Sequence, residues 1–282
     1  MRCRMNFSRV TGGQYRVPLP GDGGIRLRCL VLCGIFFATV IVASLVPTGG
    51  HADEVRVAVA ANFRRTFQDL AARFQTDQGH QVVTSYASTG KLYAQIHAGA
   101  PFHLFLAADT ERPERLFGAG LAVDAGQVYA LGRLVLWSRD PTRLTGHGDL
   151  AAYTTSLRRL AMANPETAPY GRATREALRK TNLWSTLSGR MVFGEDVGQT
   201  LAFVASGNAE VGFVALSQVQ TMAREGTPGS WWELPRDIYP PIAQKMVLLK
   251  NGAAQPAARK LMEFLVSAPA RALIAQGGYD LP

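Results

Sequence analysis

The sequence has very little cysteine, and this excludes several kinds of chemistry. Three cysteines occur among 282 residues, and all of them (Cys3, Cys29 and Cys33) lie near the start of the chain. The chain beyond residue 52 therefore has no disulfide, no thiolate nucleophile and no cysteine metal site. The histidines are few and widely separated in the sequence, so their spacing does not favour a histidine metal site.

The motifs of common hydrolases are also absent. The sequence contains neither Gly-x-Ser-x-Gly nor His-Glu-x-x-His, which would indicate a serine hydrolase or a zinc protease. The Gly90-Lys91 pair occurs in phosphate loops, but Ser85 stands where such a loop needs its first glycine and Leu92 stands where it needs a hydroxyl. These absences favour a binding protein over an enzyme.

The positive charge is concentrated at one end. The formal net charge is +9, and residues 1–52 hold six arginines against one aspartate. No Lys/Arg-rich run with interleaved aromatics follows residue 52, so the charge does not predict a nucleic-acid partner.

Residues 29–46 (CLVLCGIFFATVIVASLV) are apolar and uncharged, and a turn-rich segment with small residues at Gly50 and Ala52 follows them. A basic region, an apolar region and a small-x-small site are typical of a secretory signal. We predict a signal peptide at 1–52, cleavage after Ala52 and export to the periplasm. The alternative is a retained anchor helix, because about 18 apolar residues can span a bilayer. Lipid attachment at Cys33 is disfavoured, since Leu32 stands where a small residue is needed.

Residues 53–135 begin with alternating strands and helices. Strands are predicted at 55–60, 81–86 and 102–107, and helices at about 64–78, 91–98 and 112–119. This β-α-β-α-β-α order predicts a parallel sheet with helices on both faces.

The pattern then repeats in a second segment. Residues 128–138 are predicted as a long strand that passes into a second lobe, and 239–250 as the strand that returns. Between them, strands are predicted at 157–163, 190–193 and 211–216, with helices at about 170–181 and 199–206. We therefore predict an α/β fold of mostly parallel sheets flanked by helices, with lobe 1 at 53–135 plus 245–282 and lobe 2 at 136–244. Ligands bind at the carboxyl ends of such strands, so we expect the ligand cleft between the lobes.

Four predicted strand-to-helix turns can face that cleft, two in each lobe. They are Ala61-Asn62, Ser88-Thr89-Gly90, Tyr170-Gly171 and Asp196-Val197-Gly198. A helix N-terminus exposes unpaired N–H groups and a partial positive charge, so converging helix starts can bind an anion without a charged side chain. The alternative is that Asn62, Ser88 or Thr89, and Asp196 are only N-caps. Asp196 is best interpreted as a cap, because a carboxylate would repel an anion.

Several stretches of the chain resemble a known family. They are AVAANF (58–63), SYASTGKLYAQIHAGAPFHLFLAAD (85–109), YALGRLVLWS (129–138), ANPETAPYGRATREAL (163–178), EDVGQTLAFVASGNAEVGFVALSQV (195–219) and GGYDLP (277–282). In this order they are similar to the periplasmic molybdate-binding proteins of ABC importers. The resemblance implies a two-lobe, type II periplasmic-binding-protein fold.

The resemblance also implies a set of oxyanion-binding positions. These are Ala61, Asn62, Ser88, Thr89, Tyr170 and Val197. Asn62 and Ser88 or Thr89 would donate from side chain and backbone, whereas Tyr170 and Val197 would donate backbone N–H groups. This chain departs from the family at two positions, since some members carry a hydroxyl residue at Ala61 and a tyrosine at Ala215. We expect its donor set to rely on the side-chain amide of Asn62.

The function implied by the resemblance is capture of molybdate or tungstate and delivery to a membrane permease, by a monomer without catalysis or cofactor. Neutral donors suit a dianion that presents only acceptors, whereas a protonated phosphate also needs an acceptor. The alternatives are another oxyanion, such as sulfate, or a small organic acid. An organic acid would usually require an arginine clamp, and no arginine stands at the first position of any of the four turns.

Overall fold

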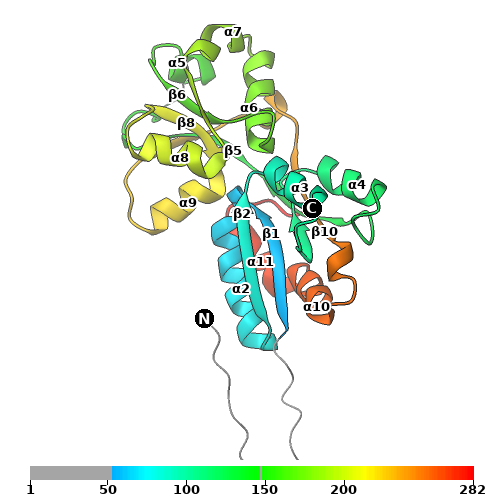
Figure 1. Cartoon of the computed structure of the whole chain (residues 1–282). Helices are drawn as coiled ribbons and strands as arrows, with labels where there is room; N and C mark the ends of the chain where they lie inside the picture. Colours follow the sequence, from blue (N-terminus) through cyan, green and yellow to red (C-terminus); the bar gives the residue numbers. More distant parts are fainter. Residues whose placement is uncertain (1–52, 147) are drawn as a thin grey trace, which may run out of the picture. The chain divides into compact units, whose positions relative to one another are not determined.

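The computed structural model describes residues 53–146 and 148–282, so the predicted signal peptide and its cleavage site lie outside the described residues. Within Ala52–Pro282, which form one compact unit, the strands make two five-stranded sheets, each with its own helices (Figure 1). None of the helices in the described part combines the length and the apolar character that a membrane span requires.

The first sheet has the strand order β2-β1-β3-β10-β4. Its strands are β1 (Glu54–Ala60), β2 (Gln81–Ala87), β3 (Leu104–Leu106), β4 (Gln127–Gly132) and β10 (Ile242–Leu248). One face packs on α2 (Arg64–Gln78), α10 (Pro256–Leu265) and α11 (Ala268–Gln276), and the other on α3 (Thr89–His97) and α4 (Glu111–Gly118). Alternation along β1 explains the two faces: Val57 belongs to the first of these cores and Ala58 to the second.

The second sheet has the strand order β7-β6-β8-β5-β9. Its strands are β5 (Leu134–Ser138), β6 (Leu160–Ala163), β7 (Met191–Gly194), β8 (Val211–Ala215) and β9 (Ser230–Glu233). Its helices are α5 (Leu150–Thr154), α6 (Pro169–Lys180), α7 (Trp184–Leu187), α8 (Val197–Ala205) and α9 (Leu216–Arg224). Short 3₁₀ turns complete the chain: η2 (Ala61–Phe63), η3 (Ser188–Arg190), η4 (Arg236–Ile238) and η5 (Lys250–Gly252). We call the elements around the first sheet the first half and those around the second sheet the second half.

Both sheets are mixed, whereas we expected mostly parallel ones. In the first sheet β10 runs antiparallel to β3 and β4, and in the second sheet β5 runs antiparallel to β8 and β9. The physical reason is that β10 and β5 each follow a point where the chain passes from one half to the other. Each strand therefore enters its sheet from the side of the other half and runs opposite to its neighbours.

The long strand predicted at 128–138 is interrupted. Its two parts, β4 and β5, belong to different sheets, with only Arg133 between them. The returning strand β10 lies entirely in the first sheet and begins at Ile242. Along the chain, sheet membership thus changes at Arg133 and again just before Ile242.

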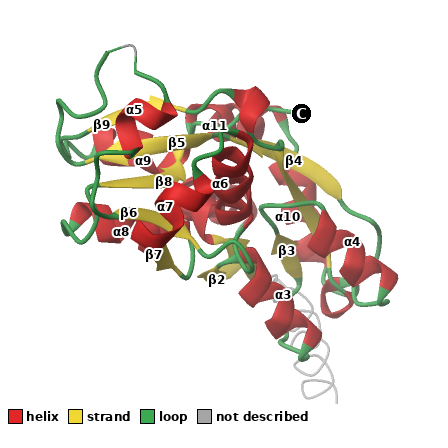
Figure 2. Cartoon of the chain, turned by 90° about the horizontal axis from the view of Figure 1, so that it is seen from above, coloured by secondary structure: helices red, strands yellow, loops and turns green. Residues whose placement is uncertain are grey.

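Parallel pairing brings the ends of neighbouring strands together. Ala60 at the end of β1 pairs with Ala87 at the end of β2, so the next residues, Ala61 and Ser88, start their turns side by side. In the second half, β6 and β7 are likewise parallel and end at the same level. Figure 2 shows the helices and strands of both halves from above. The start of α3 and the segment before α6 are joined directly, since the Gly90 N–H donates to the Thr167 carbonyl at 2.8 Å. The strand ends of both halves thus position the turns that we predicted to bind a ligand.

Candidate functional site

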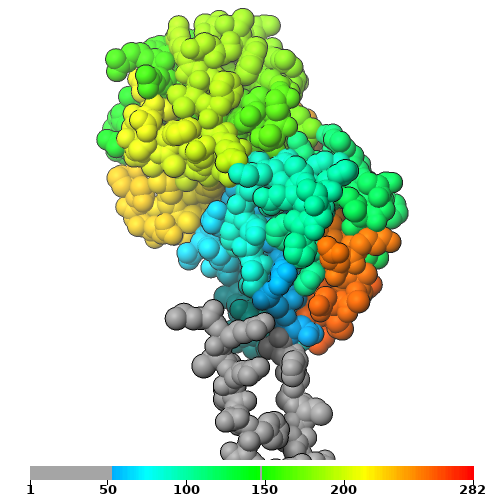
Figure 3. All heavy atoms as spheres, in the orientation of Figure 1, coloured from blue at the N-terminus to red at the C-terminus, as the bar shows by residue number. Residues whose placement is uncertain are grey.

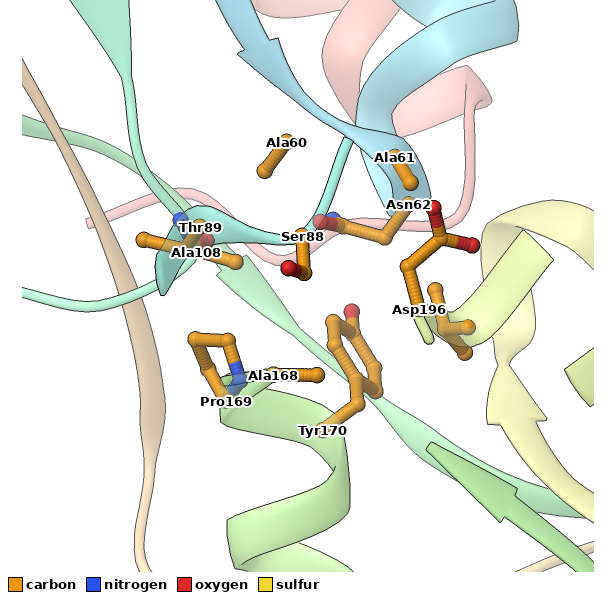
Figure 4. A pocket seen from close by; sticks show the side chains of 11 residues that line it. Ala60, Ala61, Asn62, Ser88, Thr89, Ala108, Ala168, Pro169, Tyr170 and Asp196 are labelled. Carbon is orange, nitrogen blue, oxygen red and sulfur yellow. Dashed lines mark hydrogen bonds between the residues drawn. The ribbon is translucent and has the colours of Figure 1, made fainter. Parts of the chain in front are cut away.

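The candidate site is a small cavity lined by both halves of the molecule (Figure 4). Its lining residues are Ala60, Ala61, Asn62, Ser88, Thr89, Ala108, Ala168, Pro169, Tyr170, Asp196 and Val197. All six positions that the resemblance implied are therefore brought together. The free space is only about 10 Å³, roughly the room of one water molecule, so the halves must open to admit a ligand.

Ser88 and Thr89 form the start of α3 and are almost fully buried. The Ser88 Oγ accepts a hydrogen bond from the Lys91 N–H at 3.4 Å, and the Thr89 Oγ1 accepts one from the Ala108 N–H at 3.1 Å. Both oxygens act as acceptors in these bonds, so both hydroxyl protons are still available for donation. The N-cap role and the ligand role are therefore compatible for Ser88.

The backbone N–H groups at the start of α3 differ in whether they already have a partner. The Gly90 N–H donates to the Thr167 carbonyl of the second half at 2.8 Å, which joins the halves beside the site. The Thr89 N–H is among the first N–H groups of α3, which have no intrahelical carbonyl partner. The Thr89 N–H and the Ser88 hydroxyl are thus suited to an anion in the cavity.

Asn62 reaches the cavity differently from our expectation. Its side-chain Nδ2 donates to Gln244 Oε1 at 3.0 Å and to the Tyr279 hydroxyl at 3.1 Å, which uses both amide protons. Its carbonyl accepts from the Tyr279 hydroxyl at 2.7 Å and from Ser217 Oγ at 3.2 Å. The expectation that the site relies on the Asn62 side-chain amide is therefore wrong, and the donor that Asn62 offers is its backbone N–H in η2. Its partners lie far away in sequence, so spacing gave no sign of them.

Tyr170 enters the site at the start of α6. Pro169 occupies the first position of this helix and has no N–H, so the Tyr170 N–H is the first backbone donor of α6. The following Gly171 is needed for close packing, because a Cβ there would lie 2.2 Å from the Ala163 carbonyl oxygen at the end of β6. The end of β6 thereby fixes where the first donors of α6 lie.

Val197 enters the site at the start of α8. The preceding Asp196 caps this helix, and its Oδ1 accepts from the Gly198 N–H at 2.8 Å and the Gln199 N–H at 3.0 Å. The interpretation of Asp196 as a cap is confirmed. The Val197 N–H precedes the two capped groups and remains a backbone donor for a ligand.

The cavity lining contains no lysine or arginine side chain. Three cations near it are paired with carboxylates: Arg172 bonds Glu111 at 2.7 Å, Arg112 forms an ion pair with Asp109, and Lys91 bonds Glu195 at 2.5 Å. Arg64 instead stacks over the Tyr86 ring, 4.2 Å from its centroid. Burial raises the pKa of Tyr170 well above its ordinary value, so its hydroxyl stays neutral. The donors that face the cavity are therefore uncharged.

Ala215, the second departure from the family pattern, is fully buried at the end of β8 and does not line the cavity. Its N–H donates to Gln218 Oε1 at 3.1 Å. Ala61 lines the cavity but has no side-chain donor. The candidate donors of the lining are therefore the Ser88 and Thr89 hydroxyls and the N–H groups of the four helix starts.

The fold and the site together define a class of protein. Two α/β halves, joined by crossings, enclose a small cavity that polar groups of both halves line. This is the arrangement of a two-lobe solute-binding protein, and the cavity holds the dipoles and donors that suit a small anion.

Comparisons with known proteins agree with this class. The family model described as bacterial extracellular solute-binding protein matches residues 55–280. The chain is 43% identical over 240 residues to molybdate-binding protein ModA of Azotobacter vinelandii, with 85% of this chain and 94% of that protein covered. Molybdate-binding protein ModA of Rhodobacter capsulatus is also 43% identical, over 229 residues that cover 81% of this chain and 88% of that protein.

A solved structure supports the same relationship. The periplasmic molybdate-binding protein of Azotobacter vinelandii superposes with a TM-score of 0.76 at 39% identity, and the match covers 81% of this chain and 99% of that one. The chain belongs to the family of bacterial extracellular solute-binding proteins. The resemblance, the two-lobe fold and the prediction of a binding protein rather than an enzyme are thereby confirmed.

Some residues that line the cavity were not predicted from the sequence. Ala60, Ala108, Ala168 and Pro169 form cavity walls, and small apolar residues in a turn carry no signal of binding. The role of Gly90 was also missed, although a glycine in the first turn of a helix is a signal of a close approach.

Proposed function

We propose that this protein captures molybdate or tungstate and delivers it to the membrane permease of an ABC importer. The observation that carries the proposal is a small cavity between two halves whose lining has neutral donors and no cationic side chain. The relatives named molybdate-binding proteins support the identity of the anion. The six site residues are Ala61, Asn62, Ser88, Thr89, Tyr170 and Val197, and Asn62 acts through its backbone.

The donor set explains how the protein selects its ligand. Molybdate is a dianion with acceptor oxygens only, so every oxygen can accept from a hydroxyl or an N–H group. A phosphate that carries a proton needs an acceptor in the site. Asp196 is the only carboxylate in the lining, and its Oδ1 already accepts two hydrogen bonds, so its other oxygen is the one carboxylate acceptor that a protonated phosphate could use.

The protein acts in the periplasm after cleavage behind Ala52, and it works as a monomer whose halves close on the ligand. The anion is the cargo, and the function needs no cofactor and no nucleic acid. The permease recognises the closed form with its ligand.

Sulfate is the second candidate ligand. The free space is small, and Ala61 and Ala215 remove two side-chain donors that some family members carry. Sulfate is a tetrahedral dianion with the same set of acceptor oxygens as molybdate, but it is smaller and needs less room. Sulfate therefore stays the alternative that the binding measurement must separate from molybdate.

Titration calorimetry tests the proposal. The protein is expressed with its own leader, purified from the periplasm, and titrated with molybdate, tungstate, sulfate and phosphate. We expect heat from molybdate and tungstate and none from phosphate. Heat from sulfate alone would refute the choice of ligand, and no heat from any of the four anions would refute the class of ligand.

A further inference from the structure

Gln244 is a buried polar residue just outside the cavity lining. It lies in β10 with no exposed surface. The pairing of β10 with β4 shifts register between Gln244 and Lys245, which indicates a β-bulge. Bulges redirect side chains and are common beside functional sites. The extra residue is Tyr129 of β4, because Gln244 pairs with Ala130 and Lys245 with Val128, so Gln244 and Tyr129 lie together at this irregularity.

The carbonyl end of the Gln244 side chain holds the first half of the site. Its Oε1 accepts from Asn62 Nδ2 at 3.0 Å and from the Tyr129 hydroxyl at 3.1 Å. Asn62 is thereby fixed in the turn η2, whose backbone N–H lines the cavity. Gln244 thus acts on the site through Asn62.

The other end of the same side chain faces the second half. Gln244 Nε2 is buried and has no hydrogen-bond partner among the described residues, and the same is true of the Tyr170 hydroxyl. Both atoms lie against Gly132, where a Cβ would stand 2.2 Å from the Tyr170 oxygen and 2.9 Å from Gln244 Nε2. A donor of the first half and an acceptor of the second half therefore share one small space at the crossing between the halves.

We propose that Gln244 is a positioning residue that couples the two halves of the anion site. Its carbonyl oxygen holds Asn62, and its Nε2 donates to the Tyr170 hydroxyl when the halves close fully on the ligand. The inference rests on the proposed function, because the backbone N–H of Tyr170 is one of the ligand donors. Two buried groups without partners are costly, so closure that pairs them tightens binding.

A double-mutant cycle tests the coupling. Tyr170→Phe keeps the backbone N–H and removes only the hydroxyl, so molybdate affinity in calorimetry should fall about 5-fold, the effect of one neutral hydrogen bond. In a Gln244→Met background the same change should cost little. Tyr153→Phe, whose hydroxyl contacts Gly148 and Gly146 far from the cavity lining, is the matched control and should leave affinity unchanged.

Gln244→Glu separates positioning from a structural role. A protonated carboxyl offers one donor and an acceptor, as the amide does, whereas a carboxylate only accepts and adds negative charge beside the anion. The groups that face position 244 are Asn62, Tyr129 and Tyr170, and burial keeps the pKa of both tyrosines high, so none of them titrates near neutral pH. Burial raises the pKa of the introduced carboxyl. Its affinity should be near that of the unmodified protein at pH 5 and at least about 10-fold weaker at pH 8.

The outcomes separate this inference from the proposed function. Equal losses for Tyr170→Phe in both backgrounds, or a Gln244→Glu affinity that does not change with pH, would overturn the positioning role while anion binding stands. An unmodified protein that binds none of the anions would overturn both. If Gln244→Glu does not fold, Tyr170→Phe alone decides, since an unchanged affinity refutes the coupling.

Discussion

Both halves place a helix start at the end of a strand beside the cavity, but the two halves differ in the donors that these helix starts offer. In the first half, the side chains of Ser88 and Thr89 both serve local hydrogen bonds and keep a hydroxyl proton for the cavity. In the second half, Asp196 caps α8 with a carboxylate oxygen, and the ligand is left with backbone N–H groups alone. We therefore expect side-chain selectivity to lie in the first half, and we expect the second half to close over the ligand with backbone donors.

Direct contacts hold the seam between the halves at several places, among them the Arg172–Glu111 ion pair and the bond from Ser217 Oγ to the Asn62 carbonyl. Gly90 N–H bonds the Thr167 carbonyl, Arg112 Nη2 bonds the Glu166 carbonyl at 3.1 Å, and Lys91 pairs with Glu195. Atoms of the two halves touch along this seam in the space-filling view (Figure 3). A backbone hydrogen bond and surface ion pairs therefore both join the halves. Variants of single residues can measure the two contributions separately.

The largest effect is expected from Gly90→Ala. A Cβ at this position would lie 2.8 Å from the Thr167 carbonyl oxygen and 3.0 Å from its Cα, so rigid backbone blocks the space. Overpacking typically costs about 1–3 kcal/mol, and here it acts on the closed form. Molybdate affinity measured by calorimetry should fall about 10- to 100-fold.

Gly118→Ala is the matched control for this variant. Gly118 is also helical and lies in the first half, but no atom stands within 4 Å of the point that a Cβ would occupy there. Its affinity should equal that of the unmodified protein. If Gly90→Ala binds as tightly as Gly118→Ala, the close approach of the halves at Gly90 is not needed for binding.

The second effect concerns the side-chain donors of the first half. Ser88→Ala removes a hydroxyl that we place against a charged ligand, and such bonds are worth about 1.5–3 kcal/mol. Affinity should therefore fall about 10-fold or more. Loss of the N-cap should also lower the free energy of unfolding by about 1 kcal/mol in chemical denaturation. A stability loss with unchanged affinity would show that Ser88 is only a cap.

The third effect tests the carboxylate of the second half and has the opposite sign. Asp196→Asn keeps a good N-cap and removes a negative charge from the cavity lining. Affinity for the dianion should rise about 3-fold, as expected for removing one nearby charge in a wet environment. Weaker binding in calorimetry would mean that the carboxylate helps to hold the ligand.

The smallest effect is expected from the surface ion pair at the seam. Lys91 and Glu195 are both about half exposed, and such pairs typically contribute about 0–1 kcal/mol. Lys91→Met should therefore change molybdate affinity less than about 3-fold at moderate salt. A loss as large as that of Gly90→Ala would mean that charge, not backbone contact, holds the halves together.

Much of the fold and the site could be predicted from the sequence. Strand-helix alternation gave the order of elements, and the strand ends at Asn62, Ser88, Tyr170 and Val197 marked residues that the structure brings together. Local patterns predict these strand ends and helix starts because a strand end, a cap and a turn each depend on only a few neighbouring residues. The break of the predicted 128–138 strand at Arg133 was not visible, because both parts are equally apolar and only the sheet assignment separates them.

The partners of Asn62 could not be predicted for a different reason. Gln244 and Tyr279 lie 182 and 217 positions further along the chain. Pairing across such distances depends on how β10 and the C-terminal segment pack, and no local pattern encodes it. The sequence thus placed Asn62 at the cavity, but it gave no sign that the side-chain amide is already hydrogen-bonded.

A crystal structure of the protein with molybdate, located by the anomalous scattering of molybdenum, would show directly whether neutral donors hold the anion in this cavity. We expect the metal in the cavity, with its oxygens bonded to the Ser88 hydroxyl and to the N–H groups of Thr89, Tyr170 and Val197. A lysine or arginine head group bonded to the anion, or an anion bound outside the cavity, would contradict it.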